Sequence, residues 1–281
     1  MRIALVTCRA LPDLTDDDQL MLPGLAARGI DARAVVWDDP AVDWPAYDAV
    51  IIRSPWDYHK HAAAFAGWID QLDAAGVQLW NPPGIVRANL DKRYLAALEQ
   101  AGIPIVPTVW LNTGTSTDLA SLTAANGWGD VVIKPVVSAG ASRTWRIGPD
   151  AQPTLDALVA QCDVMVQPYL AQVETSGEWS LIYFRDGFSH GVRKRPKAGD
   201  FRVQPQHGGL SARETPPAAV RAAAERLLAT IRDPWLYARV DGIDDGGQFL
   251  LMELELIEPR LFFTCAPDAA DRFAGLVAKL T

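Results

Sequence analysis

The feature that most constrains this fold is a pair of apolar runs near the carboxyl end, at residues 237–243 and 248–257, separated by the turn sequence Asp-Asp-Gly-Gly at 244–247. Two apolar runs around such a turn predict a hairpin of antiparallel strands. In the second run Glu253 and Glu255 alternate with aliphatic residues, so both carboxylates lie on one face of the strand and the aliphatic side chains on the other. The chain therefore contains a sheet that buries one face and presents carboxylates on the other.

The length of the turn decides whether Asp241 joins the acidic face. A two-residue loop at 245–246 would pair Asp241 with residue 250 and point its carboxylate into the aliphatic face, whereas a three-residue loop at 245–247 pairs it with residue 251. We expect the longer loop, because it avoids burying a carboxylate without a partner. Four side chains then share one face: Arg239, Asp241, Glu253 and Glu255. Three carboxylates so close together favour Mg²⁺ or Mn²⁺ over zinc, and the alternative is an acidic strand that simply faces solvent.

Composition limits the class of protein. The 281 residues are 49% hydrophobic and 21% charged, which is ordinary for a globular chain long enough for two or three layered units. A net charge of −8 argues against nucleic acid as a partner. Cys8, Cys162 and Cys265 are widely spaced, which fits reduced thiols and neither a disulfide framework nor a zinc site. With no signal peptide and no run of about 18 apolar residues, we expect a cytoplasmic protein without a membrane partner.

The first third of the chain predicts a small α/β unit with a parallel sheet. Its expected elements are buried strands at 2–7, 31–37 and 47–53 and helices at 16–28 and 62–75. Functional side chains of such units lie beyond the carboxyl ends of the strands. Arg53, Asp57, Tyr58 and His59 follow the third strand directly, so we expect a site there. The alternative is a capped turn with a surface histidine.

The middle of the chain combines lysines with a flexible loop. Lys92 opens a helix that we expect at 89–100, and Lys134 ends a strand that we expect at 130–134, before a run of small residues at 136–143. A lysine beside a small-residue loop is a common way to cover a triphosphate with backbone N–H groups. The loop is not a Walker A motif, and no Gly-x-Gly-x-x-Gly occurs in the chain.

Two later segments also point to a small anionic ligand. The strand expected at 164–170 breaks at Pro168, which leaves backbone groups for a ligand such as a purine edge. After a hairpin at 177–194, one stretch of this acidic protein gathers five cations: Arg193, Lys194, Arg195, Lys197 and Arg202. Such a local cluster fits a small anion better than a polymer. The remaining expected helices span residues 218–232 and 268–280.

Taken in order, these segments resemble the ATP-grasp superfamily, in particular its glutathione-synthetase-like branch. The matching pieces lie at Asn89 to Lys92, Val132 to Pro135, Val166 to Leu170, Gly177-Glu178, Gly199 to Gln204 with Gly208-Gly209, and Asp241 with Glu253 and Glu255. A longer match, which adds residues 53–59, 194–204 and 252–259, is most similar to the O-ureido-serine cyclo-ligases that make cycloserine. The sequence departs from the superfamily at Glu255, where most members have Asn.

The resemblance implies an α/β (α+β) ATP-grasp fold. Its parts would be an amino-terminal parallel-sheet domain over 1–87, a subdomain with the phosphate-covering loop over 88–165, and a carboxyl-terminal subdomain with the hinge and metal site over 166–281. ATP would bind to Lys92, Lys134, Ser138, Gly140, Gln167, Pro168, Tyr169, Leu170 and Glu178. Two Mg²⁺ ions, or Mn²⁺, would bind to Asp241, Glu253 and Glu255. Lys194 and Arg202 would be catalytic, and the substrate would contact Arg53, Asp57, Tyr58, Gln204, Gly208 and Gly209.

The resemblance also implies an activity. A carboxylate of a small amino acid is activated as an acyl phosphate and then captured by a nitrogen, with release of ADP and phosphate. In a cyclo-ligase this nitrogen belongs to the same molecule, so O-ureido-D-serine would close to D-cycloserine. Two alternatives stay open: an intermolecular ligase that joins a carboxylate to a separate amine, and a module that binds ATP without turnover. Whether the chain forms a homo-oligomer also stays open.

Overall fold

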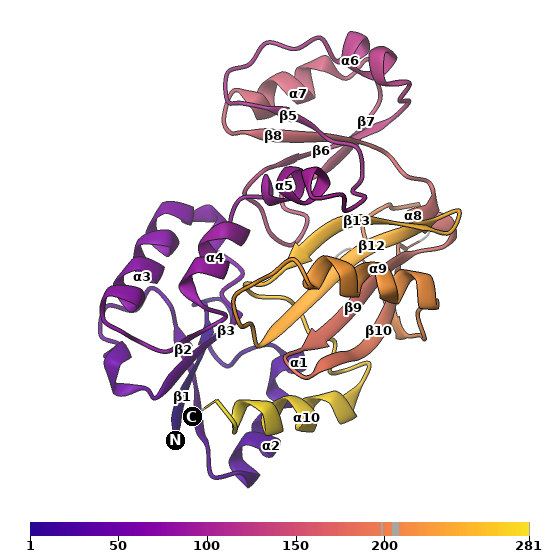
Figure 1. Cartoon of the computed structure of the whole chain (residues 1–281). Helices are drawn as coiled ribbons and strands as arrows, with labels where there is room; N and C mark the ends of the chain where they lie inside the picture. The colour runs from indigo at the N-terminus through magenta and orange to yellow at the C-terminus, as the bar shows by residue number, and fades with distance from the viewer. Residues whose placement is uncertain (198, 204–207, 281) are drawn as a thin grey trace.

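The structure is a computed structural model that describes residues 1–197, 199–203 and 208–280. The described residues form three sheets in three parts of the molecule (Figure 1). The amino-terminal sheet is parallel, a small antiparallel sheet stands apart at the top of the view, and a larger antiparallel sheet lies between them. This mixed arrangement confirms the expected α/β fold class.

The amino-terminal sheet has the strand order β2-β1-β3-β4. Its strands are β1 (Arg2–Thr7), β2 (Asp31–Val36), β3 (Ala49–Ser54) and β4 (Leu79–Trp80). β3 is buried throughout, because β1 and β4 flank it. β2 is an edge strand that leaves Asp31, Arg33 and Ala34 exposed. The expectation of a buried strand at 31–37 is therefore wrong for most of its length.

The helical segments of this part are α1 (Asp16–Gln19), α2 (Leu22–Ala27), η1 (Trp44–Ala46), η2 (Tyr58–Lys60), α3 (Ala62–Ala74) and α4 (Pro83–Asn89). The single helix that we expected at 16–28 is instead a pair of short helices. Thr15 caps α1 by accepting a hydrogen bond from the backbone of Asp18, and a proline in the first turn of α2 favours a new start at Leu22. α3 buries Phe65 and Leu72 in the core that covers the parallel sheet.

The small sheet has the order β5-β8-β6-β7 and is antiparallel. Its elements are β5 (Val109–Leu111), α6 (Leu119–Asn126), β6 (Val131–Pro135), β7 (Trp145–Ile147), α7 (Gln152–Val159) and β8 (Val164–Pro168), with α5 (Tyr94–Gln100) leading into it. Leu119 of α6 and Leu155 of α7 bury one face of the sheet in a core of their own. The other face is turned toward the larger antiparallel sheet (Figure 1).

The larger sheet has the order β11-β10-β9-β12-β13. Its elements are α8 (Gln172–Thr175), β9 (Glu178–Phe184), β10 (Gly187–Arg195), β11 (Leu210–Arg213), α9 (Ala218–Leu228), β12 (Tyr237–Asp245) and β13 (Gln248–Glu255). Alternation along β9 sends Trp179, Leu181 and Tyr183 to the face that α9 covers. The opposite face carries Glu178 and Ser180, which puts polar groups where the two antiparallel sheets face each other.

The β12–β13 hairpin turns more tightly than expected. Its loop is Gly246 and Gly247, both with positive φ, a conformation that glycine adopts without strain. A bulge in β13, with Met252 as the extra residue, then shifts the register by one. Asp241 consequently pairs with Glu253 and not with residue 251, so the expected register is wrong. The expected face is correct, because four side chains line one cavity: Arg239, Asp241, Glu253 and Glu255.

The last helix, α10 (Pro267–Val277), packs against α2 and returns the chain to the amino-terminal part (Figure 1). Phe273 and Ala274 of α10 belong to the same core as Ile3 and Leu5 of β1. The expected boundaries after residues 87 and 165 fall inside α4 and β8 and stay predictions. No helix among the described residues is long and apolar enough to cross a membrane.

Candidate functional site

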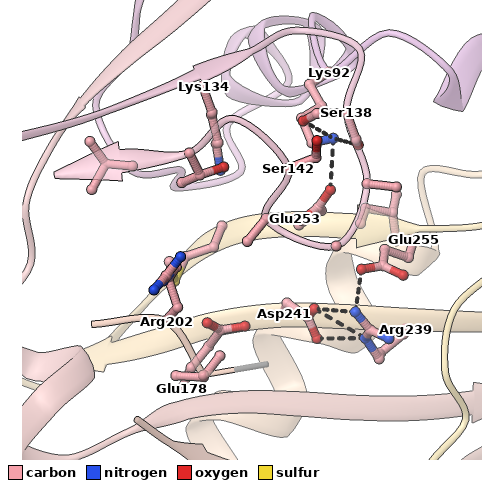
Figure 2. A pocket seen from close by; sticks show the side chains of 18 of the residues that line it. Lys92, Lys134, Ser138, Ser142, Glu178, Arg202, Arg239, Asp241, Glu253 and Glu255 are labelled. Carbon is pink, nitrogen blue, oxygen red and sulfur yellow. Dashed lines mark hydrogen bonds and ion pairs between the residues drawn. The ribbon is translucent and has the colours of Figure 1, made fainter. Parts of the chain in front are cut away.

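A cavity of about 560 Å³ opens between the two antiparallel sheets. Val132 of β6 lines it from the small sheet, Met252 and Leu254 line it from β13, and η2 closes it from the amino-terminal part. Figure 2 shows Lys92, Lys134, Ser138 and Ser142 on one side of the cavity and the charged side chains of the larger sheet on the other. The cavity thus combines apolar walls with a strongly charged side formed by the larger sheet, which we call the floor.

Most of the sequence-predicted site residues meet in this cavity. The lining includes all nine predicted nucleotide-binding residues, which are Lys92, Lys134, Ser138, Gly140, Gln167, Pro168, Tyr169, Leu170 and Glu178. It also includes Lys194, Arg202, Asp241, Glu253, Glu255 and Tyr58. These side chains come from all three parts of the fold. Their convergence supports the expectation of a single site, while the role of each stays a prediction.

Asp241 is the centre of the charged floor. Its carboxylate accepts hydrogen bonds from Arg239 at 2.8 Å, from Lys194 at 3.3 Å and from the Ser180 hydroxyl at 2.5 Å. Burial would raise the pKa of Asp241, but Arg239 and Lys194 outweigh it and hold the pKa at about 2. Lys194 also pairs with Glu178 at 2.5 Å. Asp241 therefore stays ionised, and both neighbouring cations are fixed against it.

Arg239 links Asp241 to Glu255, as the dashed lines in Figure 2 show. Burial raises the pKa of Glu255 to about 8 despite the opposing charge of Arg239. The extra carboxylate at the position where most of the superfamily has Asn is thus matched by a guanidinium on the neighbouring strand. Sequence reasoning placed Arg239 on this face but gave it no role. Its position two residues before Asp241 is the signal that could have found it.

Lys92 connects the loop that carries Ser138 to the floor. Its ammonium group donates to the Ser138 carbonyl and pairs with Glu253 at 3.0 Å. Burial opposes ionisation of Glu253, but Lys92 and Lys134 lower its pKa. Lys134 makes no hydrogen bond or ion pair with any described residue, and burial lowers its pKa. Two lysines therefore face the acidic floor, and one of them is available for a ligand anion.

The three expected metal ligands are engaged by cations. Asp241 and Glu255 contact Arg239, and Glu253 contacts Lys92. Within residues 1–197, 199–203 and 208–280, no cluster of three or more His, Cys, Asp or Glu side chains is arranged to hold a metal ion. The oxygen donors suit Mg²⁺. They would form a metal site only after Lys92 or Arg239 moves away from its carboxylate.

The opposite end of the cavity is lined by the carboxyl end of β8 and the residues directly after it. The Gln167 amide donates to Thr108, and Tyr169 lies under Arg146, whose guanidinium is 3.7 Å from the ring centroid. The Tyr169 N–H already donates to the carbonyl of Asp130, so it is not free for a purine edge. Leu170 and apolar residues of β6 and β13 form an apolar slot beside this segment.

The structure does not bring Arg53 or Asp57 into the cavity. Arg53 is fully buried, pairs with Asp18 at 2.9 Å and donates to the Pro259 carbonyl. Asp57 accepts a hydrogen bond from Trp37. The expectation that both face the cleft is not met, because each already has a partner within the fold. Gly208 and Gly209 are outside the cavity lining, and Gln204 lies outside the described residues.

Three further residues line the cavity although sequence reasoning gave them no role in the site: Glu258, Arg260 and Trp56. Burial raises the pKa of Glu258 to about 7, although a hydrogen bond from Tyr58 opposes the shift. Glu258 follows Glu255 by three residues, outside the alternating pattern of β13. A charged residue directly after a strand end, before a proline, is the signal that could have found it.

Known proteins are similar to this chain in sequence and in fold. Residues 3–81 match the family described as D-cycloserine synthetase DcsG, amino-terminal domain. The chain is 30% identical to the cycloserine biosynthesis protein DcsG of Streptomyces lavendulae, over 99% of this chain and 98% of that protein. The crystal structure of D-cycloserine synthetase DcsG is 29% identical, with a TM-score of 0.88 and 99% of both chains covered.

Two more distant proteins are also similar. Glutathione synthetase of Ralstonia nicotianae is 22% identical over 82% of this chain and 69% of its own length. The structure of an ATP-grasp RimK domain protein from Sphaerobacter thermophilus has a TM-score of 0.69 at 18% identity, with 99% and 98% of the two chains covered. The fold is thus the expected ATP-grasp fold, with two antiparallel sheets around one cavity. The full-length match at 30% identity is more specific, and the chain belongs to the DcsG family.

Proposed function

We propose that this protein is an ATP-dependent carbon–nitrogen ligase that closes O-ureido-D-serine to D-cycloserine, with release of ADP and phosphate. The observation that carries the proposal is the match to the cycloserine biosynthesis protein DcsG along almost the whole of both chains. The cavity is consistent with it, because an apolar slot for a base continues into a charged floor for phosphates and a carboxylate. The substrate is therefore a small amino acid and not a polymer.

The nucleotide would bind with its base in the slot beside Gln167 and Leu170. Its phosphates would extend toward Lys134 and Lys92, under the loop that carries Ser138. Lys134, which has no ion-pair partner among the described residues, would donate to phosphate directly. Lys92 would exchange its contact with Glu253 for a phosphate oxygen. The charge of the triphosphate would thus be met by groups already held in place, which is how most of the barrier to phosphoryl transfer is lowered.

Asp241, Glu253 and Glu255 would hold magnesium. The resemblance implies two Mg²⁺ ions, and Mn²⁺ could replace them. When bound, the metal would neutralise charge on the transferring phosphoryl group. Arg239 contacts both Asp241 and Glu255, so these carboxylates would hold the metal only after its guanidinium moves away, and the guanidinium would then be available to the reacting carboxylate. Arg202 also lines the cavity and pairs with Asp200. Its guanidinium would approach the reacting carboxylate once this ion pair opens.

The chemistry would take place in two steps. The substrate carboxylate attacks the γ-phosphorus of ATP, and ADP leaves. The nitrogen bonded to the ureido oxygen then attacks the acyl phosphate within the same molecule and loses its proton as phosphate departs. Intramolecular attack benefits from a large effective molarity, so the site need not order a second substrate. Atom balance requires that one water then removes the carbamoyl group as carbamic acid.

A coupled assay of ADP release with mass spectrometry of the product tests the proposal. We expect O-ureido-D-serine alone to stimulate ADP release and to give a cyclised product. The alternative ligase, similar in chemistry to glutathione synthetase, would instead require a separate amine. A product that carries the mass of an added amine would therefore overturn cyclisation. Nucleotide binding without any ADP release would favour a binding module.

A further inference from the structure

The segment that follows β13 is held by an unbroken series of side chains. Five successive backbone carbonyls, from Ile257 to Leu261, each accept a hydrogen bond. The donors, in order along the segment, are Tyr237 at 2.8 Å, Trp56 at 3.2 Å, Arg53 at 2.8 Å, Arg239 at 3.1 Å and His190 at 3.0 Å. They come from the amino-terminal part and from the larger sheet. The segment is thus fixed where these two parts meet, which is the requirement for a precise binding position.

Glu258 projects from this fixed segment to the cavity. It is 9% exposed, lines the cavity and interacts with the hydroxyl of Tyr58, which lines the same cavity. The other carboxylates of the floor are all paired: Glu178 and Asp241 with Lys194, Glu253 with Lys92, and Glu255 with Arg239. Glu258 forms no ion pair with any residue that the structure describes. It is the one carboxylate of this cavity whose described partner is a neutral hydroxyl.

A buried carboxylate without a cation is costly, so the site is incomplete as it stands. The elevated pKa of Glu258, about 7, has the same origin. A ligand that brings its own positive charge would complete the site, and a small amino acid has an ammonium group one bond from the carbon that carries its carboxylate. On the basis of the proposed function, we propose that Glu258, oriented by Tyr58, binds the α-ammonium group of the amino-acid substrate.

This assignment gives the substrate a defined orientation. The ammonium group lies at Glu258, and the carboxylate is directed toward the floor around Asp241 and Arg239, where phosphoryl transfer would occur. The ureido arm occupies the remaining direction from the α-carbon. Three directions around one carbon distinguish its two configurations, so Glu258 would contribute to selection of the D form. Tyr58 is a positioning residue, because it acts through Glu258.

The test compares O-ureido-D-serine with its desamino analogue, in which hydrogen replaces the ammonium group. ADP release reports on both, because each has the carboxylate that is phosphorylated. We expect the wild-type kcat/KM to favour the amino acid by roughly 10- to 100-fold, the range for a hydrogen bond to a charged group. Glu258→Gln should reduce this preference to within about 3-fold and leave the KM for ATP unchanged. Glu99→Gln, an exposed control, should keep the wild-type preference.

Tyr58→Phe provides a second variant that removes only the hydroxyl. We expect it to raise the KM for the amino acid while kcat and the KM for ATP change little, a pattern that general loss of structure would not give. Equal use of the two compounds by the wild-type protein would overturn the inference, and so would a preference that persists in Glu258→Gln. Either result leaves the ligase assignment intact. Absence of ADP release with O-ureido-D-serine would instead overturn the proposed function, and the inference with it.

Discussion

Replacement of Arg53 by Met tests whether this side chain supports the fold or contacts substrate. Its guanidinium is fully buried between Asp18 and the Pro259 carbonyl. The substitution would leave the Asp18 side chain, which is 3% exposed, without a cation, and a broken buried ion pair typically costs about 3–5 kcal/mol. The Pro259 carbonyl would lose its donor at about 1–3 kcal/mol more. We therefore expect a loss of about 4 kcal/mol or more from the free energy of unfolding.

The assay is equilibrium urea unfolding, together with KM values for ATP and for O-ureido-D-serine. Adding Asp18→Asn to Arg53→Met removes the unpaired charge. We therefore expect the free energy of unfolding of the double variant to be about 2 kcal/mol higher than that of Arg53→Met alone. Any fall in activity should follow the loss of folded protein. The reasoning would be refuted by a variant within about 1 kcal/mol of the wild type whose KM for the amino acid has risen at least tenfold, because that pattern indicates direct contact with substrate.

Three further predictions follow from the charges of the site and the core. Glu253→Gln should abolish ADP formation and leave the melting curve native-like, whereas near-wild-type turnover would exclude the metal site. Lys134→Ala should weaken ATP binding by about 2–3 kcal/mol and adenosine binding far less, and equal weakening would make this lysine structural. Burial lowers the pKa of His190 from 6.5 to about 4, so stability present above pH 6.5 should be lost toward pH 4, by about 3 kcal/mol. Urea unfolding of wild type and His190→Gln at both ends of this range measures the loss, and identical pH dependence of the two proteins would contradict it.

The sequence was informative where the pattern is local. Alternation along β13 placed Glu253 and Glu255 on one face, and a lysine at the end of a strand placed Lys134 at the cavity. The register of the hairpin was not predictable in the same way. Both the glycine turn and the bulge at Met252 shift the pairing, and the two shifts together restore the face that alternation predicts.

Contacts between distant segments account for what the sequence did not predict. Arg53 stands at the end of a strand like a functional residue, but its partners Asp18 and Pro259 are 35 and 206 residues away. From the sequence we expected the cavity floor to consist of three carboxylates around a metal ion. The ion pair from Lys92 to Glu253 was not predicted, because it joins two parts of the fold that no local pattern connects. Glu258 lies beyond the end of β13, where alternation no longer applies.

The contact of α10 with the amino-terminal part has a consequence for biosynthesis. Ile3 and Leu5 of β1 share a core with Phe273 of α10, and almost all of the described chain separates the two elements. The apolar face of β1 therefore stays uncovered until α10 has been synthesised, and such faces make folding intermediates prone to aggregation. Yield of folded protein in the cell should thus depend on chaperones that shield this face until α10 is available.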